Sequence, residues 1–153
     1  MKAPPKGRQR ILVVEDERAI RDLLRVHLEN AGYEVATAPD AVVAGKQLLA
    51  DPASIDLLIV DAKLPFMGGI EFASTLIADS SLPVIPLVLI TGYQDFADRA
   101  DILGVPCLIK PFTADALVQI VARSIGASSL QSAAGIRERG VARLAHEYGK
   151  GRA

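Results

Sequence analysis

The sequence predicts one α/β domain in which a parallel β-sheet is covered by helices on both faces. Five short apolar segments of strand length alternate with amphipathic segments of helix length. The strand segments are apolar on both faces, which is typical of buried parallel strands. Because crossovers between parallel strands are right-handed, this order of elements favours a doubly wound sheet. The length of 153 residues suits one domain with short flanking segments.

The first half of the chain contains three of the predicted strands, at residues 11–14, 33–37 and 56–61. A helix is predicted over residues 18–31, with Gly32 as its stop signal. Asp40 is expected to cap a second helix that ends at Asp51, because the residue before a proline avoids helical backbone.

The second half contains the remaining two strands, at residues 87–90 and 105–109. Gly68 and Gly69 are expected to open a third helix. Pro86 precedes a strand without interrupting it, since proline is tolerated at a strand's first position. A short acidic helix is predicted over residues 95–103, and Thr113 is expected to cap a last helix that ends near residue 125.

Composition excludes several classes of protein. Half of the residues are apolar and 23% are charged, so a large core is expected and global disorder is not. The longest nearly uninterrupted apolar stretch, residues 82–90, contains two prolines and is too short to span a bilayer, and no signal peptide is recognisable. The single Cys107 excludes a disulfide framework and a CxxC metal site. We therefore expect a cytoplasmic protein without membrane insertion.

Charge is distributed unevenly along the chain. Residues 11–127 carry 16 acidic and 8 basic residues, whereas residues 1–10 and 128–153 are basic. A nucleic-acid-binding face needs clustered Lys and Arg, so direct nucleic-acid binding is not expected. The basic ends are interpreted as solvated tails: residues 1–7 as a disordered arm, and residues 128–153 as an extension with some helical periodicity.

Polar side chains interrupt the apolar strands at their carboxyl ends. Glu15 and Asp16 follow the first strand, while Asp61, Thr91 and Lys110 end the third, fourth and fifth strands. In an open α/β sheet the ligand crevice lies at this edge, so these side chains are expected to converge. Three carboxylates repel one another unless a cation neutralises them, and oxygen ligands select a hard ion such as Mg²⁺.

A lysine and a hydroxyl beside such an ion suit a phosphoryl group. The sequence contains no Ser/His/Asp set, Walker loop or GxGxxG motif, which leaves a carboxylate as the nucleophile and an aspartyl phosphate as the chemistry. Taken singly, each residue has a structural explanation: Asp16 can cap a helix, and Lys110 can be a surface ammonium. The five residues taken together favour the functional interpretation.

Four motifs occur in order along the chain. They are Ile-Leu-Val-Val-Glu-Asp-Glu at 11–17, Asp-Leu-Leu-Ile-Val-Asp at 56–61 with Leu64-Pro65 and Met67-Gly68-Gly69, Leu-Ile-Thr-Gly at 89–92, and Lys-Pro-Phe at 110–112. With these motifs, residues 8–127 resemble the receiver domain of bacterial two-component response regulators. The resemblance implies a flavodoxin-like five-stranded parallel sheet of order 2-1-3-4-5.

The resemblance also implies a role for each residue at the strand ends. Asp61 would be the phosphoacceptor, which attacks the phosphohistidine of a partner kinase. Asp16, Asp61 and the backbone carbonyl of Lys63 would bind Mg²⁺ directly, and Glu15 would act through water. Thr91 would hydrogen-bond to the phosphoryl group, and Lys110 would pair with it.

A receiver of this kind is a signalling protein and catalyses only its own phosphorylation and slow dephosphorylation. The partners implied are a sensor histidine kinase or a histidine phosphotransfer protein, a downstream protein target, and a second copy of the chain in a homodimer. The peptide bond between Lys110 and Pro111 is expected to be cis, as such domains usually have it.

Three features depart from the family pattern. Cys107 stands where the family usually has an aromatic residue that swings inward on activation, and its thiol is expected to be inert. Lys63 and Tyr93 occupy positions that tune dephosphorylation, and their bulk predicts a long-lived phosphoprotein. Residues 128–153 are too few for an output domain, so a stand-alone receiver is expected, with a docked or a fraying extension as equal alternatives.

Two other functions are alternatives to this one. The main alternative is a receiver-like interaction module that no longer uses phosphate. Cys107, in place of the usual aromatic residue, is compatible with this alternative. An aspartyl-phosphate phosphatase or mutase would need a second carboxylate two residues after the nucleophile, where this chain has Lys63.

Overall fold

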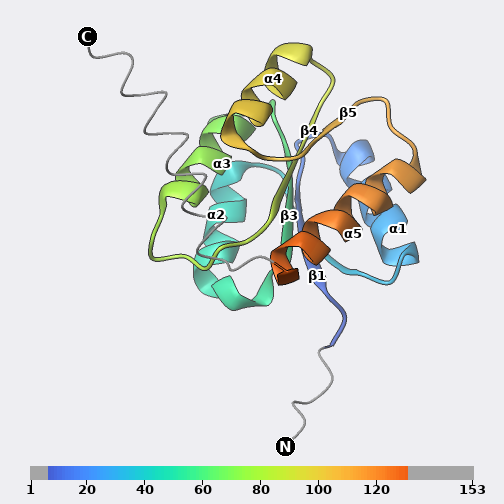
Figure 1. Cartoon of the computed structure of the whole chain (residues 1–153), viewed down its shortest axis with the longest axis horizontal. Coiled ribbons are helices and arrows are strands. Elements are labelled where there is room, and N and C mark those ends of the chain that lie inside the picture. The colour runs from blue at the N-terminus through green and yellow to red at the C-terminus, as the bar shows by residue number, and fades with distance from the viewer. Residues whose placement is uncertain (1–6, 131–153) are drawn as a thin grey trace, which may run out of the picture.

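The computed structural model describes residues 7–130 and contains a five-stranded parallel sheet of order β2-β1-β3-β4-β5 (Figure 1). The doubly wound fold and the strand order are therefore confirmed. In chain order, the elements are β1 (Arg10–Val14), α1 (Arg18–Asn30), β2 (Glu34–Ala38), α2 (Ala41–Ala50), a 3₁₀ helix η1 (Pro52–Ser54), β3 (Leu57–Asp61), α3 (Gly69–Ala78), β4 (Leu87–Thr91), α4 (Gln94–Leu103), β5 (Cys107–Ile109) and α5 (Ala114–Leu130).

Two hydrophobic layers hold the helices on the sheet, one on each face (Figure 1). α2, α3 and α4 cover one face, where Leu12 and Val14 of β1 point. α1 and α5 cover the other, where Ile11 and Val13 of the same strand point. These four side chains are fully buried. Because alternate residues of a strand point to opposite faces, a strand between two layers has to be apolar throughout, as the sequence predicted.

The register of the sheet brings the carboxyl ends of the central strands to one edge. Val14 pairs with Val60, Asp61 with Ile90, and Thr91 with Ile109. The residues at the carboxyl ends of these strands, and those that directly follow them, therefore lie side by side along one edge of the sheet.

The predicted helix signals are confirmed at three helix ends. Asp40 caps α2 by accepting a hydrogen bond of 2.9 Å from the Val43 N–H. Thr113 accepts one of 3.1 Å from Ala116 in the first turn of α5. Gly32 follows α1 at φ +97°, a left-handed conformation that glycine adopts without steric cost.

The bounds of two elements differ from the prediction by two residues or more, and those of the others by at most one. β5 starts at Cys107, two residues late, because the Val105 N–H bonds to the Ala100 carbonyl to close the end of α4, and Pro106 has no N–H to donate. α5 continues to Leu130, past the expected end near residue 125 and past the expected boundary at 127.

Within the part of the chain that the structure describes, no helix is long and apolar enough to cross a membrane. The predictions for residues 1–6 and 131–153, including the fate of the basic extension, lie outside the described residues.

Candidate functional site

The backbone ladder continues one residue beyond the strands and fixes the positions of the site residues. The Glu15 N–H donates to the Ala38 carbonyl at 3.1 Å, and the Lys110 N–H donates to the Thr91 carbonyl at 2.8 Å. The site residues are therefore held by the sheet itself, which keeps their backbone positions fixed.

Three carboxylates gather at this edge of the sheet. Glu15, Asp16 and Asp61 each offer an oxygen, and these oxygens lie within 4.8 Å of one another. Glu15 is 1% exposed and Asp61 is 7% exposed, whereas Asp16 is open to solvent. Two buried carboxylates and one exposed carboxylate form a negative site that is accessible from one side.

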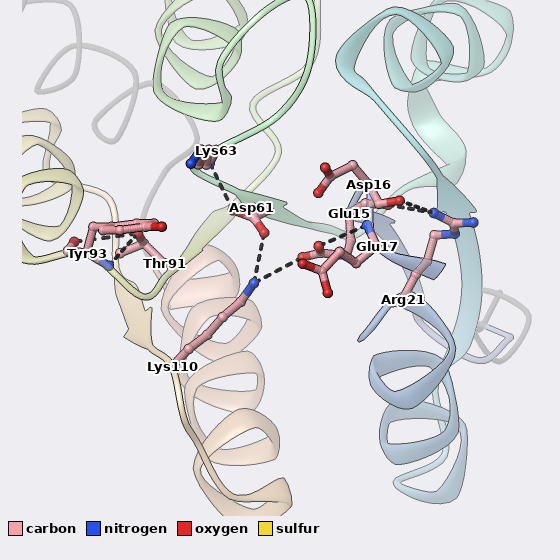
Figure 2. A network of polar contacts seen from close by, with 9 residues as sticks. All are labelled: Glu15, Asp16, Glu17, Arg21, Asp61, Lys63, Thr91, Tyr93 and Lys110. Carbon is pink, nitrogen blue, oxygen red and sulfur yellow. Dashed lines mark hydrogen bonds and ion pairs between the residues drawn. The ribbon is translucent and has the colours of Figure 1, made fainter. Parts of the chain in front are cut away.

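The ammonium of Lys110 lies between the two buried carboxylates (Figure 2). Its Nζ is 2.9 Å from Oδ2 of Asp61 and 3.4 Å from Oε2 of Glu15. The other oxygen of Asp61, Oδ1, accepts a hydrogen bond of 2.9 Å from the backbone N–H of Lys63. Both oxygens of Asp61 are thus held by donors, which orients the carboxylate.

Burial and crowding change the protonation of the cluster. Burial, together with the hydrogen bond and the negative charge of Asp61, raises the pKa of Glu15 from 4.5 to about 8. Partial burial opposes the charge on Lys110, but hydrogen bonds and attraction to Asp61 and Glu15 outweigh it, and the pKa of Lys110 is raised. Adding positive charge is therefore favourable here, and adding negative charge is costly.

The donor set fits a hard divalent cation. The ligand atoms on offer are carboxylate oxygens, and the described residues place no histidine or thiol in the cluster. Such a set is typical of Mg²⁺, which is often held by one or two carboxylates and keeps several waters. Glu15, Asp16 and Asp61 could hold the ion, as predicted from their positions in the sequence.

The structure places Thr91 at the same edge, 1% exposed, with its hydroxyl engaged by the β4–α4 connection. Its Oγ1 accepts a hydrogen bond of 3.0 Å from the backbone N–H of Tyr93. The peptide bond between Lys110 and Pro111 is cis, as expected.

Two contacts at the rim were not predicted. Nη1 of Arg21, on α1, donates to the backbone carbonyls of Glu15 at 2.8 Å and of Asp16 at 3.4 Å (Figure 2). Arg21 therefore holds the acidic loop, but neither motif nor spacing marks this arginine among those of α1. The Nζ of Lys63 lies 5.3 Å from the ring centroid of Tyr93, so the two rim residues named from the sequence contact each other.

The loop that follows Asp61 is closed at its base. The Gly69 N–H donates to the Ala62 carbonyl at 2.9 Å, and a Cβ at Gly69 would overlap the Asp61 carbonyl oxygen. At the tip, Phe66 has φ +68° and is 89% exposed. The Met67 N–H bonds to the Pro65 carbonyl at 2.8 Å, which makes Phe66 the centre of a strained γ-turn.

A model of the response regulator receiver domain matches residues 11–122 of this sequence. The chain belongs to this family. The match includes all five strands except the first residue of β1, and it includes the three carboxylates, the threonine and the lysine of the cluster.

Similar proteins and structures agree with this assignment. The uncharacterised transcriptional regulatory protein YrkP of Bacillus subtilis is 38% identical over 108 residues, which cover 71% of this chain and 46% of YrkP. The DNA-binding response regulator MtrA of Mycobacterium tuberculosis is 33% identical over 113 residues, covering 72% of this chain and 48% of MtrA. The receiver domain thus spans about half the length of the curated relatives it matches.

Solved structures of receiver domains match the fold over most of their own length. A receiver domain protein from Clostridium thermocellum has a TM-score of 0.74 at 29% identity, covering 80% of this chain and 98% of that one. The receiver domain of NtrX from Brucella abortus has a TM-score of 0.70 at 31% identity, covering 77% and 99%. These matches support a role in two-component signalling.

Cys107 sits half-buried on β5 of this receiver domain and packs against the layer formed by α2, α3 and α4. Burial raises the pKa of its thiol, which keeps the sulfur in its neutral form at neutral pH. This environment agrees with the expectation of an inert thiol.

Proposed function

We propose that this receiver domain accepts a phosphoryl group on Asp61 from a phosphohistidine and signals through protein contacts. The observation that carries the proposal is the Lys110 ammonium held between buried Asp61 and Glu15, beside the exposed carboxylate of Asp16. An interaction module without this chemistry gains nothing from buried carboxylates, which are costly to maintain.

In the proposed reaction, a carboxylate oxygen of Asp61 attacks the phosphorus atom of the donor. The new O–P bond forms as the P–N bond breaks, and the leaving imidazole keeps the electron pair and takes up a proton. Mg²⁺ bound by Asp16 and Asp61, by the backbone carbonyl of Lys63 and through water by Glu15 would neutralise charge on the phosphoryl oxygens.

The chain's own groups then stabilise the product. Lys110 already bonds one oxygen of Asp61 at 2.9 Å, so its ammonium can pair with the acyl phosphate with little movement. The Thr91 hydroxyl, at the end of the neighbouring strand, would donate to a phosphoryl oxygen. Lys63 and Tyr93 at the rim would slow the attack of water on the acyl phosphate.

The proposed partners follow from this chemistry. The donor is a sensor histidine kinase or a histidine phosphotransfer protein, which places the reaction in the cytoplasm. The phosphorylated protein acts on a downstream protein target or passes the phosphoryl group on, and a second copy of the chain is a further candidate partner. Under this proposal the chain catalyses only its own phosphorylation and its own slow dephosphorylation.

The test is the intact mass of the protein after incubation with phosphoramidate, which contains a P–N bond like that of phosphohistidine. Wild type is expected to gain one phosphoryl group in the presence of Mg²⁺ and none in the presence of a chelator. Asp61→Asn should gain none. Asp56→Asn is the matched control, because Asp56 precedes the same strand and accepts a hydrogen bond from Arg10 at the opposite edge of the sheet.

The outcomes separate the two candidate functions. An adduct that requires both Mg²⁺ and Asp61 establishes the phosphoacceptor. If the folded wild type and Asp56→Asn both gain no phosphoryl group, the result would instead favour the interaction module that does not use phosphate.

A further inference from the structure

The loop that carries Asp16 is bonded on both sides of this residue. Before it, the Glu15 N–H donates to the Ala38 carbonyl of β2 at 3.1 Å. After it, the Glu17 N–H donates to Oε1 of Glu15 at 3.2 Å (Figure 2). The Glu17 carbonyl accepts a hydrogen bond of 2.9 Å from the Arg21 N–H at the start of α1. These bonds fix the residues on either side of Asp16 but do not hold its own carbonyl or carboxylate.

The side chain of Arg21 holds the Asp16 carbonyl (Figure 2). Its Nη1 donates to this carbonyl at 3.4 Å and to the Glu15 carbonyl at 2.8 Å. Arg21 lies in the first turn of α1, and the side chains of a helix lean toward its N-terminus, so the guanidinium reaches back over the preceding loop. In the part of the chain that the structure describes, no other donor bonds these two carbonyls.

The carboxylate of Asp16 depends on this backbone for its position. It is exposed, and among residues 7–130 no group donates a hydrogen bond to it. The carboxylate of Asp61, in contrast, is held by a donor at each oxygen. Because Mg²⁺ demands a nearly octahedral set of oxygens at about 2.0–2.1 Å, a small displacement of the Asp16 backbone would weaken the binding of this ion.

We propose that Arg21 is a positioning residue of the Mg²⁺ site: it acts through the backbone of Glu15 and Asp16 and keeps the Asp16 carboxylate where it can bind the ion. The inference rests on the proposed function, which places Mg²⁺ at Asp16 and Asp61. It adds to the ligand set a residue of α1 that touches neither the ion nor the phosphoryl group and still determines how tightly the ion binds.

The charge of Arg21 and its hydrogen bonds have opposite effects on the affinity for Mg²⁺. A guanidinium near the site repels a second cation, so the charge alone weakens binding, and its removal would strengthen binding. The hydrogen bonds position a ligand, and loss of a residue that holds a metal ligand typically lowers metal affinity about 10–100-fold. The direction in which the affinity of Arg21→Ala changes therefore separates a positioning role from an effect of charge.

Two other arginines of α1 provide matched controls. Arg18 belongs to the same first turn, but its side chain is 86% exposed and pairs with Asp22 at 3.8 Å, so Arg18→Ala removes a charge without touching the loop carbonyls. Arg25 lies one turn further along and donates from Nη2 to Oγ1 of Thr37 on β2 at 3.0 Å. Arg25→Ala thus removes a similar bond between α1 and its surroundings, away from the carboxylates.

Calorimetric titration of Mg²⁺ into the full chain tests the inference, and thermal unfolding in the presence of a chelator measures the stability of each metal-free variant. Arg21→Ala is expected to bind Mg²⁺ about tenfold more weakly or worse, whereas Arg18→Ala and Arg25→Ala should keep the wild-type affinity. The Mg²⁺ concentration that gives half of the maximal rate of phosphorylation by phosphoramidate should rise by the same factor in Arg21→Ala. If that variant does not fold, Arg21→Met, which keeps the apolar stem without a donor, takes its place with the same expectations.

Each result decides the inference. An unchanged or increased affinity for Mg²⁺ in the folded Arg21 variant would overturn the positioning role and leave the proposed function standing. An equal loss of affinity in Arg25→Ala would also overturn it, because the effect would then follow the stability of α1 and not the position of the loop. A folded wild type that binds no Mg²⁺ would overturn both the positioning role and the place of the ion in the proposed function, and the titration of the wild type identifies that case directly.

Discussion

At the scale of single residues, Glu15 shows how position changes chemistry. It is a carboxylate one residue beyond a strand, yet the fold buries it against Asp61 and raises its pKa to about 8. Because its pKa is raised above the unfolded value of 4.5, the metal-free protein is expected to lose stability as the pH rises from about 4.5 through 8.

Binding of Mg²⁺ should therefore depend on pH. At pH 6 Glu15 is largely protonated, and the ion favours its charged form, so affinity should increase between pH 6 and pH 8, up to about tenfold per pH unit. Calorimetric titration of Mg²⁺ in buffers of different ionisation enthalpy measures both the affinity and the proton released. Glu15→Gln should flatten the pH dependence, and an equally steep dependence in that variant would contradict the assignment.

Phe66 is a second residue whose conformation the sequence did not reveal. It is 89% exposed at φ +68°, so the side chain contributes little burial while the backbone is strained. Phe66→Gly is expected to stabilise the protein by about 0.5–1 kcal/mol, the relief of strain being partly offset by the greater entropy of unfolded glycine. Urea unfolding measures the change. Phe66→Ala keeps the strained Cβ and should show no gain.

At the scale of elements, most starts and stops were predictable and the exceptions have local causes. Asp40, Thr113 and Gly32 mark helix ends through hydrogen bonds or backbone conformations that belong to their residue types. The late start of β5 was not predictable from its apolar pattern, because Val105 is used to close α4. Gly126 directly follows the predicted end of the last helix near residue 125, but α5 continues through this glycine to Leu130.

Two glycines in helical segments should respond to substitution in opposite ways. A Cβ at Gly69 would overlap the Asp61 carbonyl oxygen, whereas a Cβ at Gly45, on α2, meets nothing within 4 Å. Gly69→Ala should destabilise the fold by about 2 kcal/mol or more and slow phosphorylation of Asp61, because the loop must shift. Gly45→Ala should stabilise by about 0.5–1 kcal/mol. Thermal unfolding compares the two, and equal effects would contradict the close approach at Gly69.

At the scale of the whole molecule, the fold class and the edge of the sheet that carries the site were predictable, because both follow from strand periodicity. The contacts between individual side chains were not predictable. The position of Lys110 between Asp61 and Glu15, and the pairing of Lys63 with Tyr93, depend on side-chain orientation and on the spacing of strands. The hold of Arg21 on the acidic loop is likewise a property of the packed structure.

The two hydrophobic layers share one sheet, so they should unfold together. Leu48, on α2, is 1% exposed, and its neighbour Leu49 is 70% exposed. Leu48→Ala is expected to cost about 2–5 kcal/mol and to lower a single transition, whereas Leu49→Ala should change stability by about 0.5 kcal/mol or less. Denaturant unfolding followed by circular dichroism is the measurement. A second transition in Leu48→Ala would show that the layers are independent.

The bonds of Lys110 join residues far apart in the sequence, 49 positions to Asp61 and 95 positions to Glu15. Contacts of such long range are slow to form, since the intervening chain must be ordered first. A chain still emerging from the ribosome has its first carboxylates in place well before the lysine that completes their charge balance. The ability to react with a phosphodonor is therefore expected to appear only once the last strand has docked. Incompletely synthesised chains would then not be phosphorylated and would not signal.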